Sequence, residues 1–169
     1  MGEFNVRAAT PSDLAAIEAL LVATYPRLLA GAYTPEVLEA AMPYMIRAQD
    51  SLLQSGTYFV ALDASQPVAA GGWTPEAPGT GIVAPGIGHI RHVVVAHDRA
   101  GQGLGRRLMD HITEDAIAGG IETMECLATL NAVAFYQAMG FEVLEDLTVT
   151  FPDGADLPSV RMQNRIREN

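Results

Sequence analysis

The sequence has no lysine, a single cysteine and no long apolar run, and each absence excludes a class of protein. All 10 basic residues are arginines, against 20 acidic residues, so the formal net charge is −10. Such a chain lacks the basic face that nucleic-acid phosphates require, so we expect no nucleic-acid partner. The single thiol, Cys126, excludes an internal disulfide and a multi-thiolate metal site, which favours a reduced, cytoplasmic setting. No window reaches about 18 uninterrupted apolar residues, so we expect no membrane span.

The residues that are present have an ordinary globular composition. Hydrophobic residues make up 49% and charged residues 18% of the 169-residue chain, a length that fits one domain over residues 1–169. No repeat or polar linker divides it, and the N-terminus, with an early acid and no apolar run, is unlike a secretory signal. The acidic balance mildly favours a cationic small substrate, although solubility alone is the simpler explanation.

Periodicity and turn signals predict a mixed order of strands and helices. We expect strands at 4–8, 57–62, 68–73, 87–96, 121–128, 141–151 and 159–166, and helices from Thr10, from Thr34 to about 53 with a break or kink at Pro43, at 104–117 and at 131–139. A loop rich in glycine and proline covers 75–86. The order β-α-α-β-β-β-α-β-α-β-β indicates a mixed sheet with helices on its faces.

The most informative stretch runs from a valine-rich strand through a glycine-rich turn into a helix. It reads Val93-Val94-Val95-Ala96-His97-Asp98-Arg99-Ala100-Gly101-Gln102-Gly103-Leu104-Gly105-Arg106. Glycines allow the backbone to approach another group closely, and the first helical turn leaves N–H groups free at the positive end of the helix dipole. Phosphate binds well at such a place, and Arg106 and Arg107 add cationic donors.

Three diphosphate-binding patterns compete for this turn. The dinucleotide pattern G-x-G-x-x-G fails, because counting from Gly101 or Gly103 places Arg106 or Leu108 at the last glycine. The P-loop fails because it needs a lysine. The remaining match, G-Q-G-L-G-R-R-L after a buried strand, resembles the coenzyme A pyrophosphate loop of the GNAT superfamily. The alternative is a structural turn that only begins a helix.

A second segment strengthens this resemblance. Leu127 to Phe141 is similar to the superfamily's second segment that contacts coenzyme A, a strand followed by Asn-Ala-x-x-Phe-Tyr-x-x-x-Gly-Phe. The two matches occur in the expected order and, with the N-terminal Val-Arg-Ala-Ala-Thr-Pro-Ser-Asp-Leu, cover most of the chain. The resemblance implies an α/β fold with a mixed, mostly antiparallel sheet of about seven strands, a splayed parallel pair within it and about four flanking helices.

The resemblance also implies acetyl-CoA as co-substrate and direct transfer of its acetyl group to a primary amine in a ternary complex. Tyr136 is then the general acid that protonates the departing thiolate. The implied contacts with the co-substrate come from the strand amides, the glycine turn and the late helix: Val93, Val94, Val95, Ala100, Gly101, Gln102, Gly103, Leu104, Gly105, Arg106, Asn131 and Phe135. Ala100 departs from the family pattern, where Arg or Gln is frequent.

The general base is not determined by the sequence. Candidates are His89, His92, Glu125 or a relayed water, and the two histidines point to opposite faces of a strand unless a bulge intervenes. Cys126 has no neighbouring histidine or cation that would activate it as a nucleophile, so we interpret it as a small buried residue. The four histidines lack acids at ligand spacing, and no metal site is expected.

The acceptor is the least determined part. The resemblance implicates the first two helices, the loop after the third strand and the final hairpin, with Tyr33, Arg47 and Trp73 as substrate-binding candidates and Tyr25, Arg27, Tyr44 and Ser159 nearby. A small-molecule amine, an amino acid or a peptide N-terminus fits, because arginines favour a carboxylate, whereas the acidic net charge favours a polyamine or an aminoglycoside. The resemblance also suggests a homodimer that pairs through the late strands.

Three other functions remain open at this point. The first is transfer of another acyl group, or transfer to oxygen. The second is a non-catalytic acyl-CoA sensor that retains the binding site. The third is a plain structural α/β domain.

Overall fold

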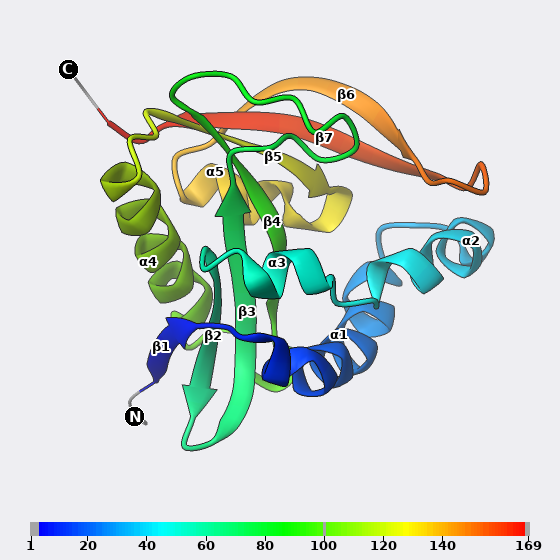
Figure 1. The fold of residues 1–169 in the computed structure, drawn as a ribbon. Helices are drawn as coiled ribbons and strands as arrows, with labels where there is room; N and C mark the ends of the chain where they lie inside the picture. Colours follow the sequence, from blue (N-terminus) through cyan, green and yellow to red (C-terminus); the bar gives the residue numbers. More distant parts are fainter. Residues whose placement is uncertain (1–3, 100, 168–169) are drawn as a thin grey trace.

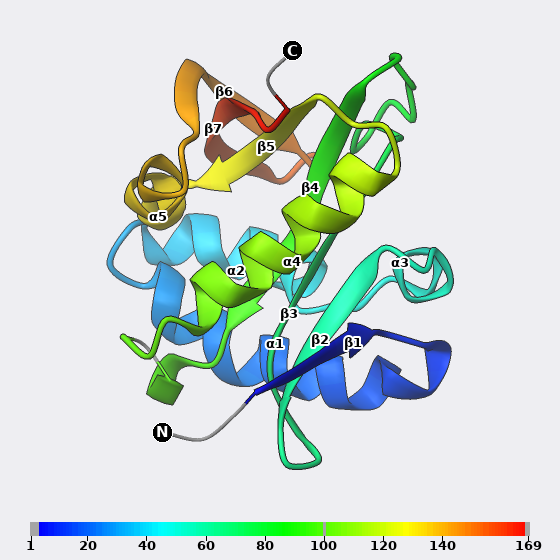
Figure 2. The ribbon, with the colours of Figure 1, turned by 90° about the vertical axis from the view of Figure 1, so that its left-hand side faces the viewer.

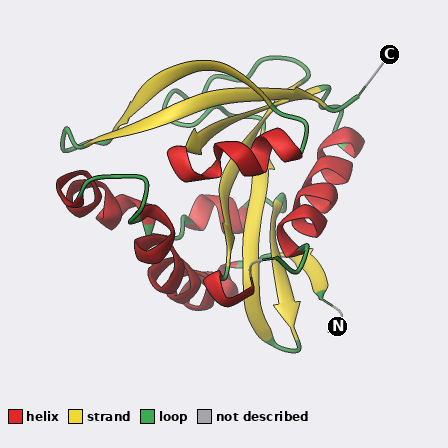
Figure 3. Ribbon diagram, turned by 180° about the vertical axis from the view of Figure 1, so that it is seen from behind, coloured by secondary structure: helices red, strands yellow, loops and turns green. Residues whose placement is uncertain are grey.

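The structure is a computed structural model that describes residues 4–99 and 101–167. Within these ranges the chain forms one mixed sheet with helices on both faces (Figure 1, Figure 3). The elements are β1 (Asn5–Ala8), α1 (Leu14–Leu29), α2 (Pro35–Met45), α3 (Asp50–Gln54), β2 (Tyr58–Asp63), β3 (Gln66–Thr74), β4 (Ile87–Val95), α4 (Leu104–Ala118), β5 (Thr123–Thr129), α5 (Val133–Ala138), β6 (Glu142–Thr150) and β7 (Asp156–Arg165). No helix in the described ranges is both long and apolar enough to cross a membrane.

The predicted helix starts are confirmed at both N-terminal helices. Thr10 and Asp13 form a capping box around a short 3-10 turn that leads into α1, and Arg7 binds the Asp13 carboxylate at 2.9 Å. The hydrogen bonds from Arg7 hold the pKa of Asp13 below its ordinary value. Thr34 caps α2 by accepting a hydrogen bond from the Val37 amide at 3.3 Å.

Of the break or kink predicted at Pro43, the break is wrong. Pro43 lies inside α2, which continues to Met45, and the chain leaves the helix only over residues 46–49 before α3. The fixed φ of proline is compatible with a helix, and within the last turn the missing N–H removes a single hydrogen bond.

The sheet contains one parallel pair. Its strand order is β1-β2-β3-β4-β5-β7-β6, and only β4 and β5 run parallel. These two pair at Ile87↔Thr123, Gly88↔Met124 and His89↔Glu125, and after that point no register is shared. The resulting divergence of β4 and β5 is visible in Figure 2. The predicted fold class, with its splayed parallel pair, is confirmed.

Alternation along β2 explains how the sheet builds a core on each face. Phe59 and Ala61 belong to the apolar cluster that includes Leu108 and Ile112 of α4. Tyr58, Val60 and Leu62 point the other way, into the cluster that includes residues of α1 and α3. Successive strand side chains point to opposite faces, so one strand serves both clusters. The sheet is therefore held between α4 on one side and α1 on the other.

Candidate active site

A β-bulge interrupts β4 just beyond its last pair with β5. The register with β3 runs Gly72↔Arg91 and then Ala70↔Val94, so an extra residue is accommodated at His92 and Val93. His92 has a positive φ of 48°, which for a residue other than glycine costs on the order of 1–3 kcal/mol. Hydrogen bonds to the carbonyl groups of His92 and Val93 offset this strain.

Two tyrosine hydroxyls hold this bulge in place. The Tyr58 hydroxyl donates to the His92 carbonyl at 2.9 Å, and the Tyr25 hydroxyl donates to the Val93 carbonyl at 3.2 Å. Burial raises the pKa of both tyrosines above the ordinary value, so both remain donors. On the β3 side, Gly71 leaves the room that the bulge needs, because a Cβ there would lie 2.8 Å from Cγ2 of Val93.

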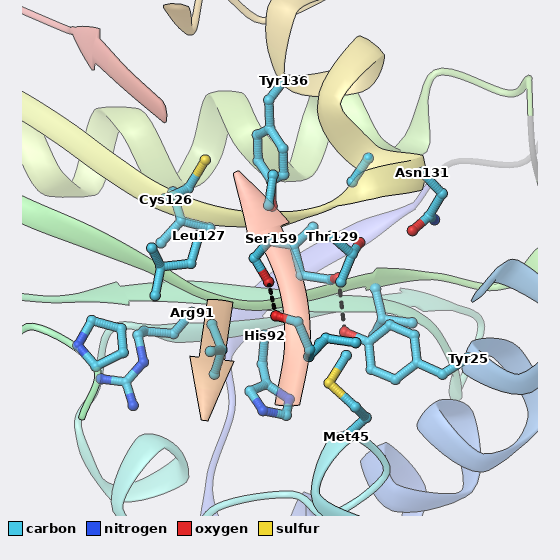
Figure 4. Close-up of a pocket in the computed structure, with 18 of the residues that line it drawn as sticks. Tyr25, Met45, Arg91, His92, Cys126, Leu127, Thr129, Asn131, Tyr136 and Ser159 are labelled. Atoms are coloured by element: carbon cyan, nitrogen blue, oxygen red, sulfur yellow. Dashed lines mark hydrogen bonds between the residues drawn. The ribbon is translucent and has the colours of Figure 1, made fainter. Parts of the chain in front are cut away.

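A cavity of about 400 Å³ occupies the gap where β4 and β5 part, and we call it the gap cavity (Figure 4). It is lined from β4, β5, α1, α5 and the β6–β7 hairpin, with further residues from the connecting segments: Tyr25, Leu28, Met45, Gln49, Pro78, Ile90, Arg91, His92, Val93, Val94, Val95, Cys126, Leu127, Ala128, Thr129, Asn131, Ala132, Phe135, Tyr136, Val149, Phe151, Leu157 and Ser159. Among the predicted residues, Val93, Val94, Val95, Asn131, Phe135, Tyr136 and His92 all lie here.

A second cavity of about 550 Å³ lies at the start of α4, and we call it the turn cavity. Gly101 and Gly103 have φ values of 80° and 74°, and a Cβ at either position would meet nothing within 4 Å. Glycine is required there by the backbone conformation, and the space beside it is open. At Gly105 the reason is different, because a Cβ would come within 2.9 Å of the Phe135 ring.

The turn cavity is basic although the protein is acidic. Its lining in the described part of the chain contains Arg27, Arg99, Arg106 and His97 and no carboxylate. Arg99 also forms an ion pair with Asp63 at 2.8 Å. The 15-residue α4 begins at this cavity, so its free N–H groups and the positive end of its helix dipole face the cavity. The arrangement suits a bound anion with several negative charges.

The comparisons with known proteins agree with this geometry. Residues 54–143 match the family model described as Acetyltransferase (GNAT) domain, which is more than half of the chain. The chain belongs to the GNAT acetyltransferase family. No curated protein sequence matches it significantly.

Solved structures of GNAT proteins share the whole fold. A GCN5-related N-acetyltransferase from Rhodopseudomonas palustris is 25% identical with a TM-score of 0.77, over 98% of this chain and 97% of that one. The PaiA N-acetyltransferase of Thermoplasma acidophilum, solved with coenzyme A, is 17% identical with a TM-score of 0.72, over 96% and 99%. The ribosomal-protein-S18-alanine N-acetyltransferase of Escherichia coli is 17% identical with a TM-score of 0.66, over 99% and 96%.

In this GNAT protein the side chain of Tyr136 is buried at the wall of the gap cavity. It is 7% exposed and packs edge-on against Phe135 and Phe141, each with ring centroids 5.3 Å away. Its hydroxyl makes no hydrogen bond within the described residues, so it is available to a ligand in the cavity. Burial raises the pKa of Tyr136 well above its ordinary value, and the group remains a proton donor.

Cys126, on β5, lies near Tyr136 of α5 but is not activated as a nucleophile (Figure 4). Burial, and secondarily the charge of Glu125, raise the pKa of the thiol to about 12. Because the thiolate is the nucleophilic form, burial leaves this thiol protonated and not activated at neutral pH.

The two candidate histidines are both weak bases. Burial, aided by the charge of Arg91, lowers the pKa of His92 to about 4. Burial also lowers the pKa of His89, which does not line the gap cavity. The bulge that the sequence left open as an alternative is present. His92 lines the gap cavity but is a weak base, and His89 lies outside that cavity.

The three substrate-binding candidates fall outside the gap cavity. Trp73 is part of the core, where its indole N–H donates to Asp115 at 2.8 Å. The Tyr33 hydroxyl donates to the Pro158 carbonyl at 2.6 Å and accepts from the Leu130 amide at 2.9 Å, which ties the segment between α1 and α2 to β7 and to the segment after β5. Arg47 is exposed on the segment before α3. The family resemblance suggested these residues, and in this structure none of the three lines the gap cavity, so their role in acceptor binding stays a prediction.

Several other predicted contacts need adjustment. Leu104, Gly105 and Arg106 line the turn cavity with Gly101 and Gly103, whereas the side chain of Gln102 is exposed and does not. Arg107 turns away and donates to the Phe4 carbonyl at 3.1 Å. Ala100 lies outside the described residues.

Sequence reasoning missed Arg91, which lines the gap cavity from β4. Its sequence signal was its place between the two candidate histidines on a strand already assigned to the site. Across the described ranges, no three potential metal-ligating side chains of His, Cys, Asp or Glu lie together.

Proposed function

We propose that the protein is an N-acetyltransferase that uses acetyl-CoA and acetylates a primary amine by direct attack in a ternary complex. The observation that carries this proposal is that the gap cavity adjoins the turn cavity. The two share Leu28, Val95 and Phe135 as lining residues. A ligand with an anionic end and a long neutral arm fits such a pair of cavities, with the anion at the start of α4 and the arm between β4 and β5.

The residues fit coenzyme A at both ends. Amides of the first α4 turn and the side chains of Arg27 and Arg106 would bind the phosphates, since helix N-termini and arginines are favourable phosphate sites. The Ala96 amide donates to Val68 on β3 at 2.8 Å. By the alternation of an antiparallel pair, the Val94 amide also faces β3, which leaves the amides of Val93 and Val95 for the arm. The expected contact from the Val94 amide is therefore not part of our proposal.

The chemistry assigned to this chain is acid assistance and shielding from water. Bound acetyl-CoA supplies an acetyl thioester, whose sulfur leaves as a thiolate that needs a proton. Tyr136 is a buried, protonated hydroxyl on the cavity wall with no partner in the described residues, and it would donate that proton.

The acceptor amine must lose a proton before it attacks, and the gap cavity favours its neutral form. No carboxylate lines this cavity among the described residues, and its walls are largely apolar. Burial without a counter-charge lowers the pKa of an amine, so an ammonium that enters would release its proton to solvent. A strong protein base is then unnecessary, which agrees with the two weakly basic histidines.

Two experiments test the proposal. The first is calorimetric titration of the protein with acetyl-CoA, and the second is a screen of amines by release of the free thiol. Tyr136→Phe should lower kcat by about 100-fold or more, as loss of a general acid does, and leave the affinity for acetyl-CoA unchanged. Tyr44→Phe is the matched control, because Tyr44 stacks on Phe151 at 4.6 Å and does not line the cavity.

The outcomes separate the remaining alternatives. Binding without turnover on any amine would favour a non-catalytic acyl-CoA sensor. Turnover that Tyr136→Phe does not change would remove Tyr136 from the acid role. A preference for longer acyl-CoA thioesters, or for alcohols over amines, would identify another acyl transfer.

A further inference from the structure

Arg91 is the one residue lining the gap cavity, among those the structure describes, that is charged at neutral pH. The lining includes neither aspartate nor glutamate, and His92 is neutral because its pKa lies at about 4. The chain contains 20 acidic residues, so the absence of carboxylates from this cavity is not a matter of composition. The electrostatics of the cavity are therefore opposite in sign to those of the whole protein.

The guanidinium of Arg91 is held in position but not neutralised. Its Nη1 donates to Oγ1 of Thr74 at 2.9 Å, and that hydroxyl donates in turn to the Glu76 carbonyl oxygen at 2.8 Å. Arg91 forms no ion pair within the described residues, although the charge of Glu76 acts on it from outside the cavity lining. Burial lowers its pKa from the usual value, but arginine stays protonated in proteins. Most of its five N–H donors thus remain for a ligand.

Its place on β4 puts Arg91 on the acceptor side of the reaction. It precedes Val93 by two residues along β4, in the direction away from α4. Figure 4 shows Arg91 and His92 on one side of the cavity, across from Cys126 and Tyr136. With the arm of the co-substrate at Val93 and Val95, the guanidinium lies just beyond the reacting thioester.

We propose that the acceptor is a small amino acid that has an apolar side chain and a free carboxylate, and that the carboxylate binds Arg91. This inference rests on the proposed function. A carboxylate matches the planar fork of a guanidinium and would supply the counter-ion that Arg91 lacks in the cavity. The rest of the acceptor end is apolar, with Pro78, Met45, Leu127, Val149, Phe151 and Leu157 in its lining. A polyamine or aminoglycoside would instead bring several cations to a cavity that holds a cation already.

The reaction of such an acceptor balances without another reactant. The bound ammonium first loses one proton to solvent. The amine lone pair then forms the N–C bond, the C–S bond breaks and its electron pair leaves with the sulfur. Tyr136 gives its proton to that sulfur and regains one from the nitrogen, so the products are the N-acetyl amino acid and the free thiol.

Matched acceptors test the proposal directly. L-Leucine, leucinamide and 3-methylbutylamine share one side chain and differ only in the carboxylate, and parallel sets exist for methionine and phenylalanine. We expect at least one amino acid to exceed its amide and its amine in kcat/KM by about 10- to 100-fold, the range for a lost charge-assisted hydrogen bond. Amides, amines or spermidine that equal the amino acids in every set would overturn the proposal, as would a preference for a C-terminally amidated peptide.

Variants then assign the preference to Arg91. Arg91→Gln should abolish the advantage of the amino acid over its amide, whereas Arg91→Lys should retain part of it. Arg165→Gln is the matched control, because Arg165 is exposed and lines neither cavity. An Arg91→Gln variant that slows amide and amino acid equally would contradict the assignment.

Failure of the inference is distinguishable from failure of the proposed function. Acetyl-CoA binding and turnover of amines without any preference for a carboxylate would overturn the inference alone. Absence of acetyl-CoA binding would overturn the proposed function and the inference with it. If coenzyme A binds but no acceptor reacts, calorimetry in the presence of coenzyme A compares the affinity of the protein for each amino acid with its affinity for the corresponding amide. Equal affinities, or no binding of either, would overturn the inference.

Discussion

At the scale of single residues, burial sets the protonation states around the gap cavity. His92 has a pKa of about 4 in the folded protein, against 6.5 for a free histidine. Its neutral form is favoured by folding, so the contribution to stability is present above pH 6.5 and is lost as the pH falls towards 4.

The first prediction concerns this titration. Over that pH window, protonation of His92 should reduce the free energy of unfolding by about 1–3 kcal/mol. Denaturant unfolding of wild type and His92→Asn at pH 7 and at pH 4.5 measures it. The wild type should lose more stability than the variant between the two pH values, and equal losses would show that His92 does not titrate as its burial requires.

Several predicted site residues line the two cavities, and backbone geometry fixes their places. Gly101 and Gly103 need a left-handed backbone, and Phe135 and Tyr136 follow a strand and begin a short helix, so spacing along the chain locates them. The sequence does not show that Trp73 packs in the core, because an aromatic residue at a strand end has the same pattern whether it packs under a helix or lines a cavity. The hydrogen bond to Asp115 that decides the matter joins residues 42 positions apart.

At the scale of elements, the bulge in β4 lies just beyond the point where β4 parts from β5, and Gly71 on β3 leaves room for it. Gly71→Ala would place a Cβ 2.8 Å from Cγ2 of Val93, which forces a shift of the bulge. Overpacking of this kind typically costs about 1–3 kcal/mol, so we expect that loss of stability together with weaker binding of coenzyme A. Thermal unfolding and calorimetry check both effects.

A matched control for this substitution lies in the chain itself. A Cβ at Gly31 would meet nothing within 4 Å, and no positive φ applies there, so Gly31→Ala should be neutral or slightly stabilising. If both variants behave alike, the tight contact at Gly71 does not hold the bulge.

The start of α4 gives a second prediction at this scale. Gly103→Val should weaken coenzyme A binding by about 10-fold or more, because a side chain would enter the space beside the free amides of α4. Gly56→Val carries the same backbone strain, with a φ of 80° against 74°, and lies outside both cavities. Both variants should lose stability to a comparable extent, but only Gly103→Val should lose affinity for coenzyme A. If the two variants bind coenzyme A equally well, the glycine turn is not the phosphate site.

At the scale of the whole molecule, charge is distributed unevenly. The net charge is −10, yet the two cavities are lined by Arg27, Arg91, Arg99 and Arg106 and by no carboxylate within the described residues. Net charge therefore predicts little about the acceptor, and the sequence hint towards a polyamine came from averaging over surfaces that do not line the site. The expected homodimer, cytoplasmic location and absence of a nucleic-acid partner stay predictions.

This distribution predicts a salt-dependent affinity. Screening between about 0.05 and 0.5 M NaCl should raise the Kd for coenzyme A by about 5- to 10-fold, because the phosphate site that we propose is lined by exposed arginines. Pantetheine, which lacks the phosphates, should show little change in the same calorimetric titrations. An affinity for coenzyme A that is independent of salt would place its phosphates away from the turn cavity.

The order of the elements could be predicted from the sequence, but how they meet could not. Turn residues and periodicity are local signals, and they located every strand to within a few residues. The bulge at His92, the two tyrosine hydroxyls that hold it and the insertion of β7 between β5 and β6 all depend on contacts distant in sequence. The splayed pair was expected only because the motifs resemble a known family.

A crystal structure of the protein with coenzyme A tests the central claim most directly. We predict diphosphate density at the amides of residues 101–106, and pantetheine density between β4 and β5 that ends beside Tyr136. Coenzyme A bound elsewhere, or a gap that closes with β4 and β5 paired along their full length, would contradict the account.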